Sequence, residues 1–319
     1  MARQRLRRSV LACPGSAPRM MEKAAGSAAD EVFLDLEDAC APAEKPAARA
    51  KVVEALRTHD WSGKVRVVRI NQVTSRWAFL DVLEIVRGAG DVLDCLMLPK
   101  ARDAGDVAFV DRALTQLEQD LGLEPGRIGI EAQIEDPLGL ENALSIATSS
   151  PRVETLVFGP ADFSASMQLP TVSVAGGSPD YPGDIFHYPL FRLAVAARAA
   201  GIQVVDGPYL AIRDLQGYAV AARRAAALGF DGKWVLHPGQ IDPCNRAFTP
   251  SQAAFDRAAA IVDAYRRATE VDGRGAVMLG DEMIDEASRK MAVQLCARGE
   301  AAGLVPTPPQ PADPAAVGA

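Results

Sequence analysis

The segment VETLVFGPADFS, residues Val153–Ser164, decides how the rest of the chain is interpreted. A short apolar run ends at Gly-Pro, and an acid, Asp162, follows at the expected start of a helix. The segment before it, IGIEAQIEDP, has the same order, because an apolar run from Ile128 to Ile134 ends at Glu135. Two carboxylates that follow two successive strands indicate one shared cation site.

Strand-like runs alternate with Ala-rich segments of helical periodicity, such as 47–56 and 190–200. A chain of 319 residues with 49% hydrophobic content can bury the core of one (β/α)8 barrel. Eight such units predict an α/β protein with a (β/α)8 TIM barrel over residues 1–245. The predicted strands are 9–13, 31–36, 64–70, 92–98, 127–134, 153–158, 202–205 and 232–236.

The residues after the barrel predict a C-terminal helical lid or oligomerisation segment over 246–303. Its apolar periodicity predicts helices over 251–267, packed on the barrel, and over about 286–298, with an extended or hairpin segment at 271–279. Residues 304–319 are rich in Pro and Ala and predict a disordered tail.

Composition excludes several classes of protein. A net charge of −7 argues against a nucleic-acid surface, which needs clustered Lys and Arg. The sequence contains no run of about 18 apolar residues, so no membrane span is expected. The five Cys show no C-x-x-C spacing, which favours reduced core thiols. A cytoplasmic enzyme is expected.

Glu135 and Asp162 are the predicted metal ligands. In a (β/α)8 barrel, catalytic groups collect where the strands end. Two hard oxygen ligands that leave positions for water and substrate suit Mg²⁺. Taken singly, Asp162 could be a helix N-cap and Glu135 a residue of a solvated loop. Their occurrence at successive strand ends favours the metal.

Arg69 ends another strand, where its guanidinium could clamp a substrate carboxylate, or form a salt bridge with Asp35 or Glu37. Asp38, with Glu37, could accept hydrogen bonds from metal-bound water, or pair with Arg69 or Lys100. Lys100 could form a Schiff base, but an ion-pair role among these acids is favoured.

The connection from Ser164 to Tyr188 is far longer than most βα connections. It contains Gly176, Gly177 and Gly183. We expect a functional loop that covers the barrel mouth, with its end at 187–188 packing near that mouth. The alternative is a disordered insertion.

Several segments together resemble the malyl-CoA lyase and citrate lyase beta-subunit family, in the right order from about residue 8 to residue 302. The subgroup of malyl-CoA and beta-methylmalyl-CoA lyases is the most similar. The segments are RSVLACPGSAPRMMEKA, VFLDLEDACAPAEKPAAR, VRIN, MLPK, QIEDPLGLENALSIA, FGPADFSASM, VDGPY, GKWVLHPGQI and GAVMLGDEMIDEAS.

The resemblance implies a Mg²⁺-dependent barrel, with Mn²⁺ as a substitute, that cleaves a 3-hydroxyacyl-CoA into a 2-oxo acid and an acyl-CoA. The family's metal ligands fall on Glu135 and Asp162, and its substrate arginine falls on Arg69. The resemblance also implies that Ala161 contacts the substrate together with Glu135, Asp162 and Arg69. It implies that Asp38 acts with Arg69 in catalysis.

The resemblance also implies where coenzyme A binds. Ala17 stands where many family members have Arg, and a neighbouring cation is expected to replace that phosphate contact. The implied coenzyme A contacts are Ser16, Arg19, Lys23, Leu236 and His237.

Asp285 precedes a predicted helix and could be its N-cap. The helix has apolar positions at Ile284, Ala287, Met291 and Leu295, which predict a buried stripe from which Asp285 points away. The family's acid/base aspartate falls on Asp285, in a lid that a neighbouring subunit contributes. A trimer or hexamer with shared sites is therefore expected.

The implied activity is reversible cleavage of L-malyl-CoA or beta-methylmalyl-CoA to glyoxylate and acetyl-CoA or propionyl-CoA. The alternatives are a citramalyl-CoA lyase, a malyl-CoA thioesterase, and a citrate lyase beta-like protein that acts with an acyl-carrier partner. Residues alone do not separate these substrates, because the wall of the pocket depends on geometry.

Overall fold

The computed structural model describes residues 3–170, 181, 183–271 and 273–307. The chain divides into two compact units, residues 1–248 and residues 249–319. The predicted barrel limit at 245 falls inside helix α10, Ile241–Phe248, which belongs to the first unit. Most of the predicted tail, 308–319, and residues 171–180 and 182 of the predicted covering loop lie outside the described residues.

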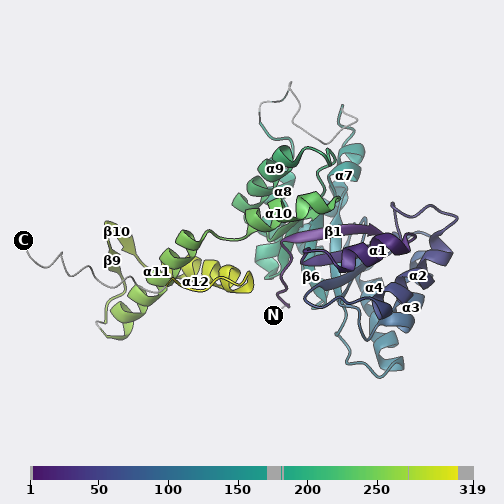
Figure 1. Cartoon of the computed structure of the whole chain (residues 1–319), viewed down its shortest axis with the longest axis horizontal. Coiled ribbons are helices and arrows are strands. Elements are labelled where there is room, and N and C mark those ends of the chain that lie inside the picture. The colour runs from purple at the N-terminus through teal and green to yellow at the C-terminus, as the bar shows by residue number, and fades with distance from the viewer. Residues whose placement is uncertain (1–2, 171–180, 182, 272, 308–319) are drawn as a thin grey trace, which may run out of the picture. The chain divides into compact units, whose positions relative to one another are not determined.

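The first unit contains a closed barrel of eight parallel strands, in which each strand pairs with the next and β8 pairs with β1 (Figure 1). All eight predicted strands are present, and their interior positions are almost fully buried. The strands are β1 Ser9–Pro14, β2 Glu31–Asp35, β3 Val65–Arg69, β4 Cys95–Leu98, β5 Gly129–Ile134, β6 Val153–Phe158, β7 Gln203–Asp206 and β8 Gly232–Val235. The predicted (β/α)8 barrel is confirmed.

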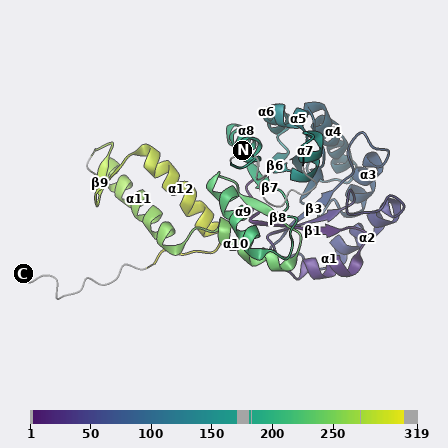
Figure 2. The ribbon, with the colours of Figure 1, turned by 90° about the horizontal axis from the view of Figure 1, so that it is seen from above.

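Helices surround these strands (Figure 2). Local sequence determines where these helices begin and end. Asp103 caps the start of α4, because its side chain accepts from the N–H of Gly105 and of Asp106. Gly201 ends α8 at a φ of 71°, which Gly adopts without strain. They are α1 Pro18–Ala25, α2 Lys45–Thr58, α3 Ala78–Ala89, α4 Ala104–Asp120, α5 Pro137–Glu141, α6 Ala143–Thr148, α7 Pro160–Ser166, α8 His187–Ala200, α9 Leu215–Ala227 and α10, with a 3-10 turn at Pro238–Gln240. No helix in the described part of the chain combines the length and apolar content that a membrane crossing needs.

An apolar layer fills the middle of the barrel. Phe33 and Trp234 lie against each other there, with ring centroids 4.5 Å apart. A second, larger cluster fills the space between strands and helices. The members of the inner layer are Val10, Phe33, Val65, Val67, Cys95, Met97, Val157, Val205 and Trp234.

A charged cluster lies in the barrel interior near the starts of the strands. Arg7, with a fully buried side chain, forms ion pairs with Glu31 at 2.8 Å, Glu131 at 3.0 Å and Glu154 at 2.7 Å. It also donates to Gln203 at 2.6 Å. Burial, followed by the charge of Glu131, raises the pKa of Glu31. The Arg7 guanidinium therefore contacts three buried carboxyl groups, of which Glu154 also pairs with Arg5 at 2.8 Å.

We predict that Arg7→Met lowers the free energy of unfolding by about 3–5 kcal/mol, because it leaves three carboxyl groups without their shared cation inside the barrel. Urea denaturation followed by circular dichroism measures the change. Arg87→Met is the control, since Arg87 pairs with Asp120 at an exposed site and its loss is expected to change stability by less than about 1 kcal/mol. Equal effects of the two substitutions would contradict this assignment.

The second unit is a pair of helices, α11 Gln252–Glu270 and α12 Glu286–Ala301, joined by an antiparallel hairpin of β9 Val277–Leu279 and β10 Glu282–Ile284. Figure 2 shows the two helices side by side. The helix predicted to pack on the barrel, α11, packs on α12 within this unit. A Cβ at Gly299 would lie 2.3 Å from the Phe255 ring, so Gly299 permits the close approach.

The predicted buried stripe on α12 is wrong in part. Ile284 is buried, but Met291 is 66% exposed and Ala287 is exposed. The buried face of α12 runs instead through Ala292 and Gly299, seven residues apart. Small residues on this face let α11 approach, and packing against α11 therefore overrides the apolar periodicity.

Candidate active site

The carboxyl ends of the parallel strands bring the predicted site residues to one mouth of the barrel. Asp35 ends β2, Arg69 ends β3, Glu135 follows β5, and Asp162 lies in α7 directly after β6. This is the end where (β/α)8 enzymes hold their catalytic groups. Contacts among these residues show how they are held.

Arg69 is bound on one edge by Asp35. Its Nε and Nη2 donate to the two Asp35 carboxylate oxygens at 2.8 and 2.6 Å. Its guanidinium also lies 5.6 Å from the Phe33 ring and 5.4 Å from the Trp234 ring. Burial opposes ionisation of Asp35, but the Arg69 charge and hydrogen bonds outweigh it and lower the pKa of Asp35. The salt bridge considered for Arg69 therefore exists.

The Nη1 atom of Arg69 is held more loosely. It lies 3.5 Å from Gln133 Oε1 and 3.2 Å from Glu37 Oε2. Glu37 Oε2 is buried, and no hydrogen-bond partner for it exists among the described residues. Arg69 Nη1 and Glu37 Oε2 thus contact each other only at ion-pair distance, without a hydrogen bond between them, and are the least tightly held polar atoms of this pair.

Glu135 is 2% exposed, so the alternative of a solvated loop residue is wrong. Its Oε1 accepts from the Lys100 backbone N–H and its Oε2 accepts from Gln133 Nε2, both at 2.8 Å. Burial, with added repulsion from Glu37 and Asp162, raises the pKa of Glu135 to about 8. A divalent cation would remove this penalty by favouring the ionised form.

Asp162 is the third residue of α7 and not its N-cap. The cap position is Gly159, which has no side chain to bond with. The alternative of a capping aspartate is therefore wrong. The Asp162 side chain is 41% exposed and lies 3.7 Å from Lys100 Nζ, while the preceding Ala161 is exposed. Asp162 thus presents carboxylate oxygens toward the mouth.

Lys100 is an ion-pair centre. Its ammonium lies against Glu37, 3.6 Å from Asp38 and 3.7 Å from Asp162. Burial opposes its charge, but the bond to Glu37 and the surrounding carboxylates outweigh it and raise the pKa of Lys100. A Schiff base needs a neutral amine, so this environment disfavours one. Asp38 is 60% exposed and pairs with Lys100, which is one of the two roles predicted for it from the sequence.

The donor set fits magnesium. Glu135 and Asp162 come from neighbouring β/α units, and Glu37 adds a buried oxygen that accepts no hydrogen bond from the described residues. Oxygen ligands without His or Cys suit Mg²⁺, which usually takes one or two carboxylates and keeps several waters. The described residues contain no cluster of three or more His, Cys, Asp and Glu arranged to hold a metal. Two protein ligands with open positions remain the arrangement that the residues support.

The predicted coenzyme A contacts come from adjacent units, because β1 pairs with β8. Ser16 precedes α1, and Arg19 and Lys23 are exposed one turn apart on that helix. Leu236 and His237 follow β8, and His237 is exposed. Both groups therefore flank the same sector of the barrel mouth.

Sequence reasoning missed two supporting residues. Gln133 is in β5, two positions before Glu135, which directly follows the strand. Alternate residues of a strand face the same side, so Gln133 and Glu135 both face the interior. This alternation is the signal in the sequence that could have identified Gln133. Lys45 is buried, and its ammonium donates to the carbonyls of Leu36 and Glu37 and to Asn71 Oδ1, at 2.6–2.8 Å. No local pattern marks that contact.

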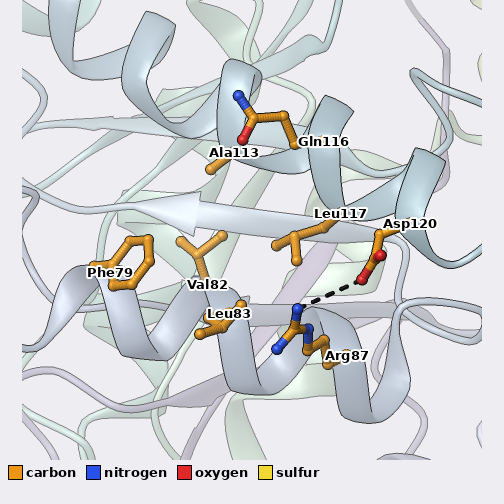
Figure 3. Close-up of a pocket in the computed structure, with 8 residues that line it drawn as sticks. All are labelled: Phe79, Val82, Leu83, Arg87, Ala113, Gln116, Leu117 and Asp120. Carbon is orange, nitrogen blue, oxygen red and sulfur yellow. Dashed lines mark hydrogen bonds and ion pairs between the residues drawn. The ribbon is translucent and has the colours of Figure 1, made fainter.

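A groove between α3 and α4 on the outside of the barrel is a separate feature (Figure 3). Phe79, Leu83 and Leu117 line it, and its charged groups, Arg87 and Asp120, pair with each other at 3.5 Å. It does not include any of the strand-end residues described above.

Comparison with known proteins identifies the family. The family model described as HpcH/HpaI aldolase/citrate lyase matches residues 8–238, which include every barrel strand. The chain belongs to this family. It is 38% identical over 296 residues to the L-malyl-CoA/beta-methylmalyl-CoA lyase of Cereibacter sphaeroides, covering 90% of this chain and 92% of that protein. It is 33% identical to the citrate lyase subunit beta of Escherichia coli, covering 94% and 95%.

Solved structures of the family share the fold. The CitE protein of Mycobacterium tuberculosis, in complex with magnesium, acetoacetate and coenzyme A, matches with a TM-score of 0.71 and 30% identity, covering 92% of this chain and 97% of that one. A citrate lyase from Burkholderia xenovorans matches in fold with a TM-score of 0.81 and 24% identity, covering 95% and 93%. Family membership makes this chain an enzyme of the carbon–carbon lyase type.

We predict that Gly159→Ala disrupts the site without unfolding the barrel. A Cβ at residue 159 would lie 2.4 Å from Glu135 Oε2 and 2.5 Å from Glu135 Cβ, so Glu135 must move. We expect Mg²⁺ binding, measured by isothermal titration calorimetry, to weaken by about tenfold or more. The control is Gly26→Ala, where the nearest atom is 3.9 Å away. Unchanged binding in Gly159→Ala would contradict the placement of Glu135 in the site.

Proposed function

We propose that this chain is a Mg²⁺-dependent lyase that reversibly cleaves L-malyl-CoA or beta-methylmalyl-CoA to glyoxylate and acetyl-CoA or propionyl-CoA. The observation that carries the proposal is the meeting of the partly free Arg69 edge with the Glu135 and Asp162 carboxylates at one barrel mouth. The 38% identity to an L-malyl-CoA/beta-methylmalyl-CoA lyase supports the choice of substrate.

Arg69 binds the carboxylate of the 2-oxo acid in this proposal. Asp35 occupies its Nε and Nη2, so the guanidinium cannot rotate, and Nη1 remains to donate to substrate. The rings of Phe33 and Trp234 beneath it exclude water and strengthen that contact. Arg69 thereby fixes the orientation of the 2-oxo acid relative to Glu135 and Asp162.

Glu135 and Asp162 would hold Mg²⁺, or Mn²⁺ in its place, which when bound supplies Lewis-acid stabilisation of charge on the substrate oxygens. The Lys100 N–H and Gln133 Nε2 orient the two oxygens of Glu135. Lys100 also draws Asp162 and Asp38 toward the same place. These contacts hold the carboxylates ready before any ligand arrives.

Coenzyme A would bind along the sector formed by β1, α1 and β8. Arg19 and Lys23 offer two exposed cations one turn apart for its phosphates. Ser16 and the Leu236–His237 turn line the route from that helix to the mouth. Ala17 contributes no charge, so Arg19 is the cation next to that position.

Cleavage turns the substrate hydroxyl into the carbonyl of the 2-oxo acid and releases the hydroxyl proton, while the electron pair of the broken carbon–carbon bond stays on the acyl-CoA as an enolate that takes up a proton. The reverse condensation needs a base that takes the proton back. Asp285 is the proposed group. It caps α12, where its Oδ1 accepts from the Ser288 N–H at 2.9 Å and from Ser288 Oγ at 3.0 Å. These bonds lower the pKa of Asp285 and keep it ionised, which is the form that a base must have.

The proposed oligomer is a trimer or hexamer in which the second unit of one subunit supplies Asp285 to a neighbour's barrel. A second candidate function is that of a citrate lyase beta-like protein acting with an acyl-carrier partner. The 33% identity to the citrate lyase subunit beta of Escherichia coli favours keeping it as the alternative.

We predict that the purified protein, incubated with glyoxylate, acetyl-CoA and Mg²⁺, forms malyl-CoA, detected by mass spectrometry. Glu135→Gln and Asp162→Asn are expected to lower the rate by about 100-fold or more, because each removes a metal ligand. The assay is repeated with pyruvate and with propionyl-CoA to rank the substrates. Malyl-CoA supplied directly and converted to malate and free CoA would indicate a thioesterase, and full activity in excess chelator would exclude the metal role.

We predict that Asp285→Asn and Glu135→Ala subunits, each inactive alone, recover partial activity when they are mixed under subunit exchange. Shared sites place an intact Asp285 beside an intact Glu135 in some mixed oligomers. Native mass spectrometry verifies that mixed oligomers form. Inactivity of verified mixed oligomers would argue that both residues act within one subunit or that Asp285 has no role.

A further inference from the structure

Lys100 has an unusual backbone conformation. Its φ is 51°, in the left-handed region that a residue with a Cβ seldom adopts. It comes directly after the end of β4, and its N–H donates to Glu135 Oε1 at 2.8 Å. The disfavoured conformation therefore aims a backbone donor at one of the proposed metal ligands. Such strain is often found at functional sites.

The side chain of Lys100 turns to the other proposed ligand. Its ammonium lies 3.7 Å from Asp162, while it also pairs with Glu37 and lies 3.6 Å from Asp38. Lys100 is therefore in contact with Glu135 through its backbone and with Asp162 through its charge. Its side chain is 24% exposed, so the ammonium lies at the edge of the site and can move outward.

We propose that the Lys100 ammonium holds the place of the divalent cation in the metal-free protein, and that metal binding displaces it from Asp162. The inference rests on the proposed metal site at Glu135 and Asp162. An ammonium and a divalent cation cannot both contact the same side of the Asp162 carboxylate, because two cations that lie so close together repel each other. Glu37 and Asp38 retain the displaced ammonium.

Lys100 is thus a positioning residue that keeps mutually repelling carboxylates together until the metal arrives. This role lowers the affinity for the metal, because the displaced ammonium remains close enough to repel the bound cation. A purely structural ion pair makes the opposite prediction: its loss would disorder the carboxylates and weaken metal binding. The sign of the change in Mg²⁺ affinity therefore separates the two roles.

The test is calorimetric titration of MgCl₂ into the full-length protein without substrates, at pH 9 and low ionic strength. Lys100→Met is expected to bind Mg²⁺ more tightly, on the order of tenfold. Lys100→Asn is expected to show the same tightening, and Asn tolerates the left-handed backbone well. Lys100→Arg keeps the charge and is expected to stay within about threefold of the wild type.

Arg102→Met is the matched control. Arg102 lies two residues further along, is 52% exposed, and pairs with Asp136 at 2.8 Å without contacting Glu135 or Asp162. Its loss removes an equal charge and is expected to change Mg²⁺ affinity by less than about threefold, because water screens an exposed charge. Thermal unfolding of each variant verifies that the barrel is intact.

Unchanged or weaker Mg²⁺ binding in both Lys100→Met and Lys100→Asn would overturn the inference. Glu135→Gln separates that result from failure of the metal site itself. If Glu135→Gln loses binding while the Lys100 variants do not gain it, only the role of Lys100 is wrong. If Glu135→Gln binds Mg²⁺ as the wild type does, the metal site and the role of Lys100 are both wrong.

Discussion

Repulsion among carboxylates at the barrel mouth is the constraint on which the site depends. Asp35, Glu37 and Glu135 are buried there within a short distance of one another, and burial makes each harder to ionise. Two cations balance them in different ways. Arg69 neutralises Asp35 in a fixed two-point pair, whereas Lys100 is shared among several acids. The remaining negative charge is what attracts a divalent cation and selects it over a neutral ligand.

The barrel separates two charged regions by an apolar layer. In the cluster near the starts of the strands, Arg7 contacts Glu31, Glu131 and Glu154, and Glu154 also pairs with Arg5, so the cluster has a structural role. At the mouth, Arg69 Nη1 makes only long contacts, to Gln133 Oε1 at 3.5 Å and to Glu37 Oε2 at 3.2 Å. Phe33 and Trp234 lie between the two regions and support Arg69 from below. The Arg7 cluster is fully buried, whereas Lys100 and Asp162 at the mouth are partly exposed, so the mouth is the end that a ligand can reach.

The second unit has the composition of a surface that meets another molecule. Met278 and Met283 of its hairpin and Met291 of α12 are more than half exposed. Methionine adapts to irregular surfaces and is common at interfaces. Asp285 lies in the same unit, at the start of α12. An aspartate beside exposed methionines agrees with the proposal that this unit acts on a neighbouring subunit.

The sequence by itself determined the eight strands and the end of the barrel at which Arg69, Glu135 and Asp162 lie. Buried parallel strands are continuous apolar runs, so the residue after each run must lie at one mouth. Only the tertiary structure decided that Asp162 is not a cap, that α12 buries its small residues, and that Arg7 and Lys100 each bind several distant acids. The ion pairs of Arg7 and Lys100 join residues from different β/α units, and the buried face of α12 depends on its packing against α11. No local sequence pattern shows which side chains will meet once these elements pack together.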